Sequence, residues 1–273
     1  MPENIKKTEA LYCMGFWPIE NNQKRNSDHY KRLLPESMKL LRGKRLHLFY
    51  DGEEIGESFV AEAERNDVEV SKSRIRISDL PTYDAVLPII STCERLVSEG
   101  KHHEEMPARE KMSMHLKRDY LLSGADAFRS MVTIWTSKLP LLADLSSSAP
   151  AGVKSVAWVD ASIAKFKGSR TNWNFMRQTW PHNRVGHYAS PMFFHGAPLP
   201  LNASFLAASI ELWPKVNALF LEELAKKAGD GYVHDEETIM SGVVTQNPEL
   251  FYTLGKPVRG IRRLPLKLAS LFQ

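Results

Sequence analysis

Short apolar runs that stop at turn residues recur along this chain of 273 residues. Such runs occupy residues 11–16 (LYCMGF), 45–50 (RLHLFY), 68–77 (VEVSKSRIRI) and 155–159 (SVAWV). The second run ends at Asp51-Gly52, a turn signal, and the fourth ends directly in a carboxylate, Asp160. Each run has the length and composition of a β-strand, so we expect strands in these four places.

Segments in which apolar residues have helical spacing lie between these runs and after the last of them. This spacing predicts a helix after residue 26, with Ser27 or Asp28 as N-cap, and helical structure over residues 106–145. Residues 202–227 also have a helical pattern, which Pro214 should break or kink, and a last helix should open at Asp235 and end near Asn247. Residues 167–191, rich in Trp, Asn, His and Pro, are expected to form a loop. Strands that alternate with helices predict an α/β fold with a mostly parallel sheet flanked by helices.

The carboxyl ends of parallel strands share one edge of a sheet, which is where ligands bind in such folds. This places Gly15, Asp51 and Asp160 along one rim. Asp160 has two interpretations: it caps a helix that starts near Ser162, or it meets a nucleotide ribose or a divalent cation. Ser162 would point to the same side if the chain stays extended.

A second group of acids lies in GYVHDEETIMSGVVTQNPELF, residues 231–251. Asp235 is a candidate N-cap, and Glu236 and Glu237 would favour the positive end of the helix dipole. Carboxylates beside His234 would equally suit a general base that acts on an acceptor hydroxyl. The two interpretations are compatible, because one acid can cap the helix while its neighbour faces a cleft.

Composition narrows the class of protein. The chain has 43% hydrophobic and 25% charged residues, as ordinary globular proteins do, and no apolar run approaches the roughly 18 residues that cross a bilayer. The start, MPENIKKTEA, lacks the apolar region of a secretory signal, and only two cysteines, Cys13 and Cys93, occur in apolar surroundings. These features predict a cytoplasmic protein with two buried thiols.

The net charge of +4 belongs to the end of the chain, where five basic residues and no acidic ones follow Glu249. Without these five, 31 basic residues face 32 acidic ones, which argues against a nucleic-acid-binding protein. We therefore expect one compact domain over residues 1–252 and a basic amphipathic tail over residues 253–273.

Several familiar motifs do not occur in the sequence. It contains no GxGxxG after the first strand, no GxxxxGK[ST], no GxSxG and no Cys/His cluster with zinc spacing. Dinucleotide-binding, P-loop and α/β-hydrolase chemistries are therefore not indicated.

The order of the remaining elements resembles that of GT-A glycosyltransferases. The resemblance spans residues 8–252 and rests on VAWVDAS, MFFHGAP, the helical segment 202–227 and HDEETIMSGVVTQNPELF. More narrowly, WTSKLPLLADL followed by AWVDASI is similar to the HtrL/YibB-like bacterial family, found with polysaccharide and lipopolysaccharide genes. The resemblance implies a GT-A-like (Rossmann-like) sheet. It also implies transfer of a sugar from a nucleotide-sugar donor to a saccharide hydroxyl, in surface polysaccharide or lipopolysaccharide synthesis.

The resemblance also implies roles for single residues. Asp160 matches the first acid of the Asp-x-Asp element, and Ser162 stands where the second acid is expected. The resemblance assigns donor or substrate binding to Met14, Gly15, Phe16, Arg25, Asp51, Lys138, Ser162 and Gly196. It assigns Mn²⁺ or Mg²⁺ to Asp160, alone or with His195 or His234, and catalysis to Asp235 and Glu236. The missing second acid leaves the dependence on metal open.

Two alternatives to a glycosyltransferase stay open. One is a non-catalytic nucleotide-sugar-binding or assembly protein of a polysaccharide cluster, which the missing second acid favours. The other is a different Rossmann-like transferase, against which the lack of a glycine-rich loop counts. The tail likewise allows three readings: its leucines pack on the domain, it contacts anionic lipid beside a lipid-linked acceptor, or its arginines clamp the donor diphosphate.

Overall fold

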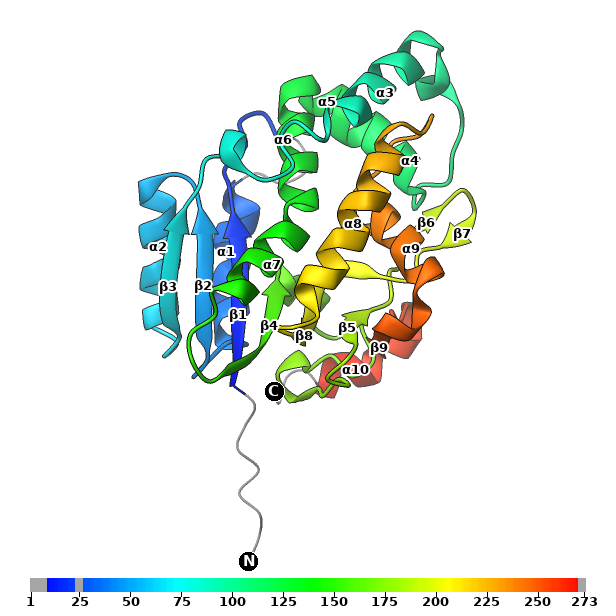
Figure 1. The fold of residues 1–273 in the computed structure, drawn as a ribbon. Helices are drawn as coiled ribbons and strands as arrows, with labels where there is room; N and C mark the ends of the chain where they lie inside the picture. Colours follow the sequence, from blue (N-terminus) through cyan, green and yellow to red (C-terminus); the bar gives the residue numbers. More distant parts are fainter. Residues whose placement is uncertain (1–8, 23–26, 270–273) are drawn as a thin grey trace, which may run out of the picture.

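The computed structural model describes residues 9–22 and 27–269 (Figure 1). Within these residues a seven-stranded sheet has the order β3-β2-β1-β4-β8-β5-β9, and a two-stranded ribbon pairs β6 with β7. The strands are β1 (Glu9–Phe16), β2 (Arg45–Tyr50), β3 (Glu69–Arg74), β4 (Val153–Val159), β5 (Val185–Tyr188), β6 (Phe193–Phe194), β7 (Ala197–Pro198), β8 (Asn202–Ser209) and β9 (Phe251–Gly255).

The main sheet is parallel except for one strand. Strands β3, β2, β1 and β4 pair in parallel, as do β5 and β9, whereas β8 is antiparallel to both β4 and β5. The expected α/β fold with a mostly parallel sheet is confirmed. Because β1, β2 and β4 run in the same direction, their carboxyl ends meet at one edge, as the sequence predicts.

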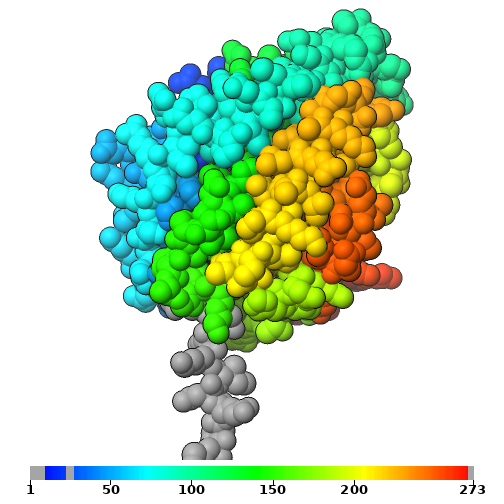
Figure 2. Space-filling view, in the orientation of Figure 1, coloured from blue at the N-terminus to red at the C-terminus, as the bar shows by residue number. Residues whose placement is uncertain are grey.

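Helices cover both faces of the sheet (Figure 1). Helices α1 and α2 pack on one face, while α7 and α8 cover the other, with α3, α6 and α9 packed around them. The space-filling view shows α7 in green and α8 in yellow side by side over that second face (Figure 2). The helices are α1 (Ser27–Lys39), α2 (Glu53–Glu64), α3 (Leu87–Ser98), α4 (Lys111–Ser113), the π-helix η3 (Met114–Tyr120), α5 (Leu121–Ser123), α6 (Ala125–Thr136), α7 (Lys138–Ser147), α8 (Trp213–Ala228), α9 (Glu236–Gln246) and α10 (Leu264–Ala269).

The central strands are buried on both faces, which explains their continuous apolar runs. In β1, Leu11 and Cys13 join the core beneath α7 and α8, while Tyr12 and Met14 join the core beneath α1 and α2. Both cysteines are free and buried, as expected.

The expected helix over 202–227 is wrong in its first third. Residues 202–209 form β8, in which every residue is buried, and the helix begins only at Trp213. Small and apolar residues such as those of β8 suit a buried helix and a buried strand alike, so pairing with β4 and β5 decides the outcome. Pro214 lies in the first turn of α8, where proline is tolerated, and therefore causes no break or kink.

Other boundaries differ in smaller ways. The helical stretch 106–145 is divided into separate helices, with Gly124 at a φ of 85° between α5 and α6. The loop expected over 167–191 contains the strand β5. Strand β9 spans residue 252, so the chain leaves the sheet only after Gly255. Among the helices of residues 9–22 and 27–269, none combines the length and apolarity that crossing a bilayer requires.

Candidate functional site

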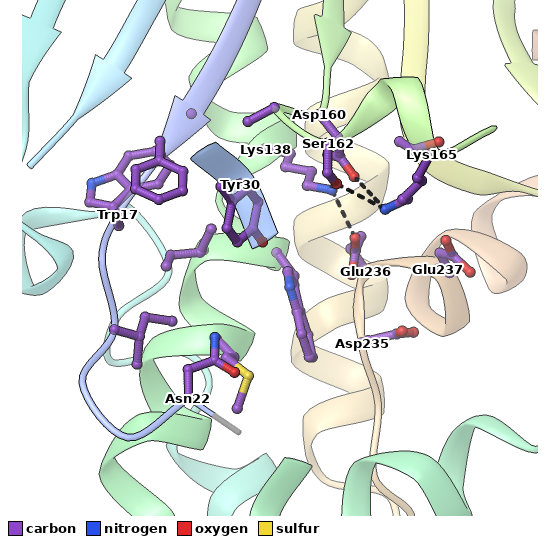
Figure 3. Close-up of a pocket in the computed structure, with 18 of the residues that line it drawn as sticks. Trp17, Asn22, Tyr30, Lys138, Asp160, Ser162, Lys165, Asp235, Glu236 and Glu237 are labelled. Carbon is purple, nitrogen blue, oxygen red and sulfur yellow. Dashed lines mark hydrogen bonds and ion pairs between the residues drawn. The ribbon is translucent and has the colours of Figure 1, made fainter. Parts of the chain in front are cut away.

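A cavity of about 670 Å³ opens at the carboxyl edge of the sheet, a volume in the usual range for small-molecule sites. Its lining includes the aromatic residues Phe16, Trp17, Tyr30 and Trp135. Across the cavity from Trp17 and Tyr30, Figure 3 shows a wall of charged side chains from β4, α7 and the start of α9. The charged residues of the lining are Glu20, Lys111, Arg118, Lys138, Asp160, Lys165, Asp235, Glu236 and Glu237.

Gly15 allows two indole rings to approach the end of β1. A Cβ atom at this position would lie 2.2 Å from the ring of Trp17 and 2.9 Å from that of Trp158. No other residue fits there unless both rings move, so Gly15 shapes the aromatic side of the cavity by its lack of a side chain.

Lys138, the first residue of α7, links the two acidic elements. Its Nζ atom donates hydrogen bonds to Oδ1 of Asp160 (3.0 Å), Oε1 of Glu236 (3.0 Å) and the carbonyl of Ala203 (3.2 Å), as Figure 3 shows for the two acids. Burial disfavours the charged ammonium, but Asp160 and Glu236 outweigh this effect and raise the pKa of Lys138 above its ordinary value. Lys138 is therefore a fixed positive charge at the centre of the site.

Asp160 follows β4 directly and faces the cavity. Its amide donates to the carbonyl of Ser204, and its Oδ1 accepts hydrogen bonds from Lys138 and from Nε1 of Trp158 (3.0 Å). Its Oδ2 lies 3.9 Å from Nζ of Lys165, which donates to Oγ of Ser162 (3.1 Å). Burial favours the neutral acid, yet the two lysines and the indole hold the pKa of Asp160 well below its usual range. With 21% of its side chain exposed, Asp160 presents a permanent negative charge to a ligand.

Asp235 is the N-cap of α9, as the sequence predicts. Its Oδ1 accepts from the amide of Thr238 (2.9 Å), whose hydroxyl accepts from the amide of Asp235 (2.8 Å), which completes a capping box. Its Oδ2 accepts from Lys111 (2.8 Å) and from Nε2 of His115 (2.9 Å). Burial would raise the pKa of Asp235, but Lys111 and His115 lower it well below the ordinary value. Both oxygens of this carboxylate thus have a structural role: Oδ1 caps α9, and Oδ2 joins the start of α9 to Lys111 and His115.

The neighbouring Glu236 has the opposite electrostatic character. Burial raises its pKa, Lys138 opposes this effect, and the negative charges of Asp235 and Glu237 add to the rise. Two adjacent carboxyls with pKa values pushed in opposite directions are typical of acid–base sites. Glu237 accepts hydrogen bonds from Ser190, Asn202 and the amide of Ala203, which anchor it beside β8.

Seven of the residues expected at the site line the cavity: Gly15, Phe16, Lys138, Asp160, Ser162, Asp235 and Glu236. Five others that the structure describes lie outside the lining, and Met14 and Asp51 are the two that belong to the sheet edge. Met14 points to the opposite face of β1 and is fully buried beneath α1 and α2. Asp51 lies at the same sheet edge but outside the cavity lining, and its carboxylate accepts from the amide of Gly52 (2.9 Å) and approaches Arg74 (3.7 Å). Arg25 lies outside the described residues.

His195, Gly196 and His234 do not line the cavity. His195 and Gly196 form the turn between β6 and β7, where both backbone amides donate to the carboxylate of Glu110. The centroid of the His195 ring lies 4.2 Å from that of the Tyr232 ring. The ring of His234 is buried beside Phe194, and burial lowers the pKa of His234 to about 4. The expected metal site of Asp160 with His195 or His234 is therefore not assembled.

The surroundings of Asp160 do not fit a divalent cation. Its carboxylate contacts the ammonium groups of Lys138 and Lys165, and a serine occupies the second acid position. Within residues 9–22 and 27–269, no three His, Cys, Asp or Glu side chains form a group that would hold a metal ion. Oxygen-rich, net-negative surroundings are what Mg²⁺ and Mn²⁺ require.

Sequence reasoning missed Lys111, His115 and Lys165, although each contacts an acid that it singled out. Lys165 lies only three residues beyond Ser162, so AWVDASIAKF contained a usable signal. Lys111 and His115 are more than 100 residues from Asp235, and no local pattern connects them.

No protein-family model and no curated protein matches this chain. Solved structures of glycosyltransferases align with most of it at low similarity. Mouse xyloside xylosyltransferase 1 is 14% identical with a TM-score of 0.44, over 90% of this chain and 84% of that one. Core-mannan synthase A from Aspergillus fumigatus, in an Mn/GDP form, is 8% identical with a TM-score of 0.46, over 93% and 74%. The glycosyltransferase GlyE of Streptococcus pneumoniae is 8% identical with a TM-score of 0.44, over 90% of this chain and 45% of that one. At this level of similarity, function has to be argued from the site.

Proposed function

We propose that this protein is a glycosyltransferase that moves a sugar from a nucleotide-sugar donor to a saccharide hydroxyl. The observation that carries the proposal is the array Asp160–Lys138–Glu236 at the carboxyl edge of the sheet, facing an aromatic wall across a cavity of about 670 Å³. A nucleotide sugar consists of a flat base, an anionic diphosphate and a polar sugar. Its site therefore needs aromatic, cationic and hydrogen-bonding side chains next to one another.

The aromatic wall is the proposed place for the nucleotide. Phe16, Trp17 and Tyr30 line this side of the cavity, and Tyr30 is the proposed ring on which a base stacks, because Phe16 and Trp17 are only 6% and 5% exposed. Lys165 and Arg118 line the same cavity and supply cationic donors for phosphate oxygens. Asp119 holds the Arg118 guanidinium in place through a hydrogen bond of 2.7 Å.

Glu236 is the proposed general base. Its raised pKa makes its carboxylate a better proton acceptor than an ordinary glutamate, and Asp235 already serves as the helix cap. As the acceptor oxygen bonds to the anomeric carbon, its proton passes to Glu236, and the bond from that carbon to the donor phosphate breaks. The electron pair of that bond leaves with the nucleoside diphosphate.

The test is to incubate the purified protein with a panel of nucleotide sugars and measure release of nucleoside diphosphate, with and without saccharide acceptors. Glu236→Gln should reduce transfer by about 10²- to 10⁴-fold and leave nucleotide affinity within about threefold, because it removes only the proton acceptor. Glu211→Gln, the same change at an exposed acid outside the cavity lining, is the control. Full transfer by Glu236→Gln would remove Glu236 from the mechanism.

The proposed setting is surface polysaccharide or lipopolysaccharide synthesis at the cytoplasmic face of a membrane, as the likeness to the HtrL/YibB-like family implies. The end of the chain supports a peripheral contact, because Ile261 (86% exposed), Leu264 (56%) and Leu268 (53%) stand in solvent among Arg262, Arg263 and Lys267. More than half of the surface of each of these apolar side chains is therefore exposed. Co-sedimentation with anionic vesicles, but not with neutral ones, is the expected result.

A second candidate function is a non-catalytic nucleotide-sugar-binding or assembly protein. Ser162 at the second acid position favours it, because the acid pair expected of an active site is incomplete. Nucleotide-sugar binding without any donor hydrolysis or transfer would support this candidate over the enzyme.

A further inference from the structure

The ammonium group of Lys165 lies where a bridging cation would be expected. Its Nζ atom donates to Oγ of Ser162 (3.1 Å) and lies 3.9 Å from Oδ2 of Asp160. These are the two positions from which a pair of acids would hold a cation, and Figure 3 shows the ammonium group of Lys165 directed toward both. A positive charge belonging to the chain thus already occupies this place.

We propose that Lys165, rather than a divalent metal ion, neutralises the diphosphate of the donor. The inference rests on the proposed function, because it concerns how the same site binds its donor. Ammonium groups bind phosphate well as compact point charges, and Lys165, 23% exposed, lines the cavity.

Two of the carboxylates that could bind a metal ion already accept hydrogen bonds from the protein. Oδ1 of Asp160 accepts from both Lys138 and Trp158, and Glu236 accepts from Lys138. A divalent cation beside Asp160 would meet the ammonium groups of Lys138 and Lys165 at short range, and this repulsion opposes its binding.

Two further acids of the lining are engaged in the same way. Asp235 and Glu237 both contact Nζ of Lys111, at 2.8 and 3.0 Å. The charges of Asp160 and Glu236 are matched by those of Lys138 and Lys165. When a diphosphate enters, Lys165 is the cation of this set that reaches it, because Lys138 stays buried between its two acids.

The decisive experiment is calorimetric titration with UDP, GDP, ADP and TDP and with the matching monophosphates, in excess chelator and again in excess Mn²⁺. The nucleoside diphosphate that binds should do so with a Kd that changes by less than about threefold between the two conditions. Lys165→Ala should weaken the diphosphate by about 10- to 100-fold, the loss expected for a charged hydrogen bond, and the monophosphate much less. Lys154→Ala, at an exposed lysine of β4, is the matched control.

Two further variants keep the test decisive. Lys165→Gln removes the charge but keeps a polar side chain that is one atom shorter, and it should show the same selective loss if Lys165→Ala folds poorly. The double variant Ser162→Asp with Lys165→Ala restores the expected acid and removes the ammonium, so its diphosphate binding should become dependent on Mn²⁺.

The outcomes separate this inference from the proposed function. Diphosphate binding by the unaltered protein that is lost in chelator and restored by Mn²⁺ would overturn the role of Lys165 and leave a glycosyltransferase standing. Equal loss of monophosphate and diphosphate in both Lys165 variants would also overturn it. No binding of any nucleoside diphosphate or nucleotide sugar in either condition would overturn the inference and the proposed function together.

Discussion

Two buried lysines at the carboxyl edge of the sheet each pair with two acids, but the two clusters have different roles. Lys111 lies between Asp235 and Glu237, and Lys138 lies between Asp160 and Glu236, with every ammonium–carboxylate distance between 2.8 and 3.0 Å. The acids of Lys111 are nearly sealed, with 3% and 7% of their side chains exposed. Asp160, by contrast, keeps 21% of its side chain open to the cavity.

The difference shows that a buried ion pair alone does not identify a functional site. The Lys111 cluster ties the start of α9 to the π-helix, because Asp235 also caps α9 and accepts from His115. The Lys138 cluster ties α7 to the end of β4 and to the start of α9, and it leaves Asp160 21% exposed to the cavity. Two properties distinguish the Lys111 cluster from the Lys138 cluster: how far a carboxylate is exposed to the cavity, and whether it also caps a helix.

The largest effect is expected from Lys111→Met. Removing the ammonium leaves Glu237 buried without its cationic partner and Asp235 with only His115, which should cost about 3–5 kcal/mol of unfolding free energy. Urea unfolding followed by circular dichroism measures it. Lys215→Met on the exposed side of α8 should stay within about 0.5 kcal/mol, and an equally small effect of Lys111→Met would refute a structural role for this cluster.

Asp160→Ala tests the other cluster and should act mainly on activity. Loss of this charge should lower donor binding or turnover by at least about two orders of magnitude, or about 2.7 kcal/mol of transition-state stabilisation, in a protein that still folds. Asp144→Ala, at an exposed acid of α7, controls for the loss of a carboxylate. If donor affinity and turnover persist in Asp160→Ala, this carboxylate only anchors Lys138.

The two duties of Asp235 can be separated by comparing Asp235→Ser with Asp235→Ala. Both remove the charge that Lys111 and His115 contact, but serine keeps an oxygen that can accept from the amide of Thr238. The alanine variant should therefore be less stable than the serine variant by about 1 kcal/mol, the usual contribution of an N-cap. Equal stability of the two would mean that the ion pairs, and not the cap, determine how α9 begins.

The smallest expected effect is on the pH dependence of stability. Burial lowers the pKa of His115, but Asp235 and Asp119 outweigh it, so the pKa is raised above the ordinary 6.5. The charged imidazole therefore stabilises the fold fully below pH 6.5, and this contribution is lost as the pH rises through the folded-state pKa. The stability difference between the unaltered protein and His115→Gln should shrink with rising pH.

Features that depend on neighbouring residues, such as strand ends and helix caps, could be predicted from the sequence, whereas contacts between residues far apart in the chain could not. The strand β2 and the cap Asp235 lie where the sequence placed them, because a turn signal or an N-cap marks each within a few residues. The pairing of Lys138 with Glu236 joins positions 98 residues apart, and no periodicity reports such a contact.

Five strands, β5 to β9, were not predicted from the sequence, and β5 and β8 were missed for different physical reasons. β8 contains small and apolar residues that suit either helix or buried strand, and its partners β4 and β5 decide. β5 has only four residues, including Gly186 and His187, and is buried against β8 and β9, so its sequence carries no alternation.

The antiparallel strand β8 has a consequence for the order in which the chain emerges from the ribosome. Strands β1 to β4 can pair with one another early, but the outer edge of β4 stays open until β8 has been made. The intervening stretch of roughly 40 residues takes on the order of 2–8 seconds at a typical translation rate of about 5–20 residues per second. During this interval an apolar strand edge is accessible to other nascent chains, so we expect slower translation to promote aggregation and holdase chaperones to suppress it.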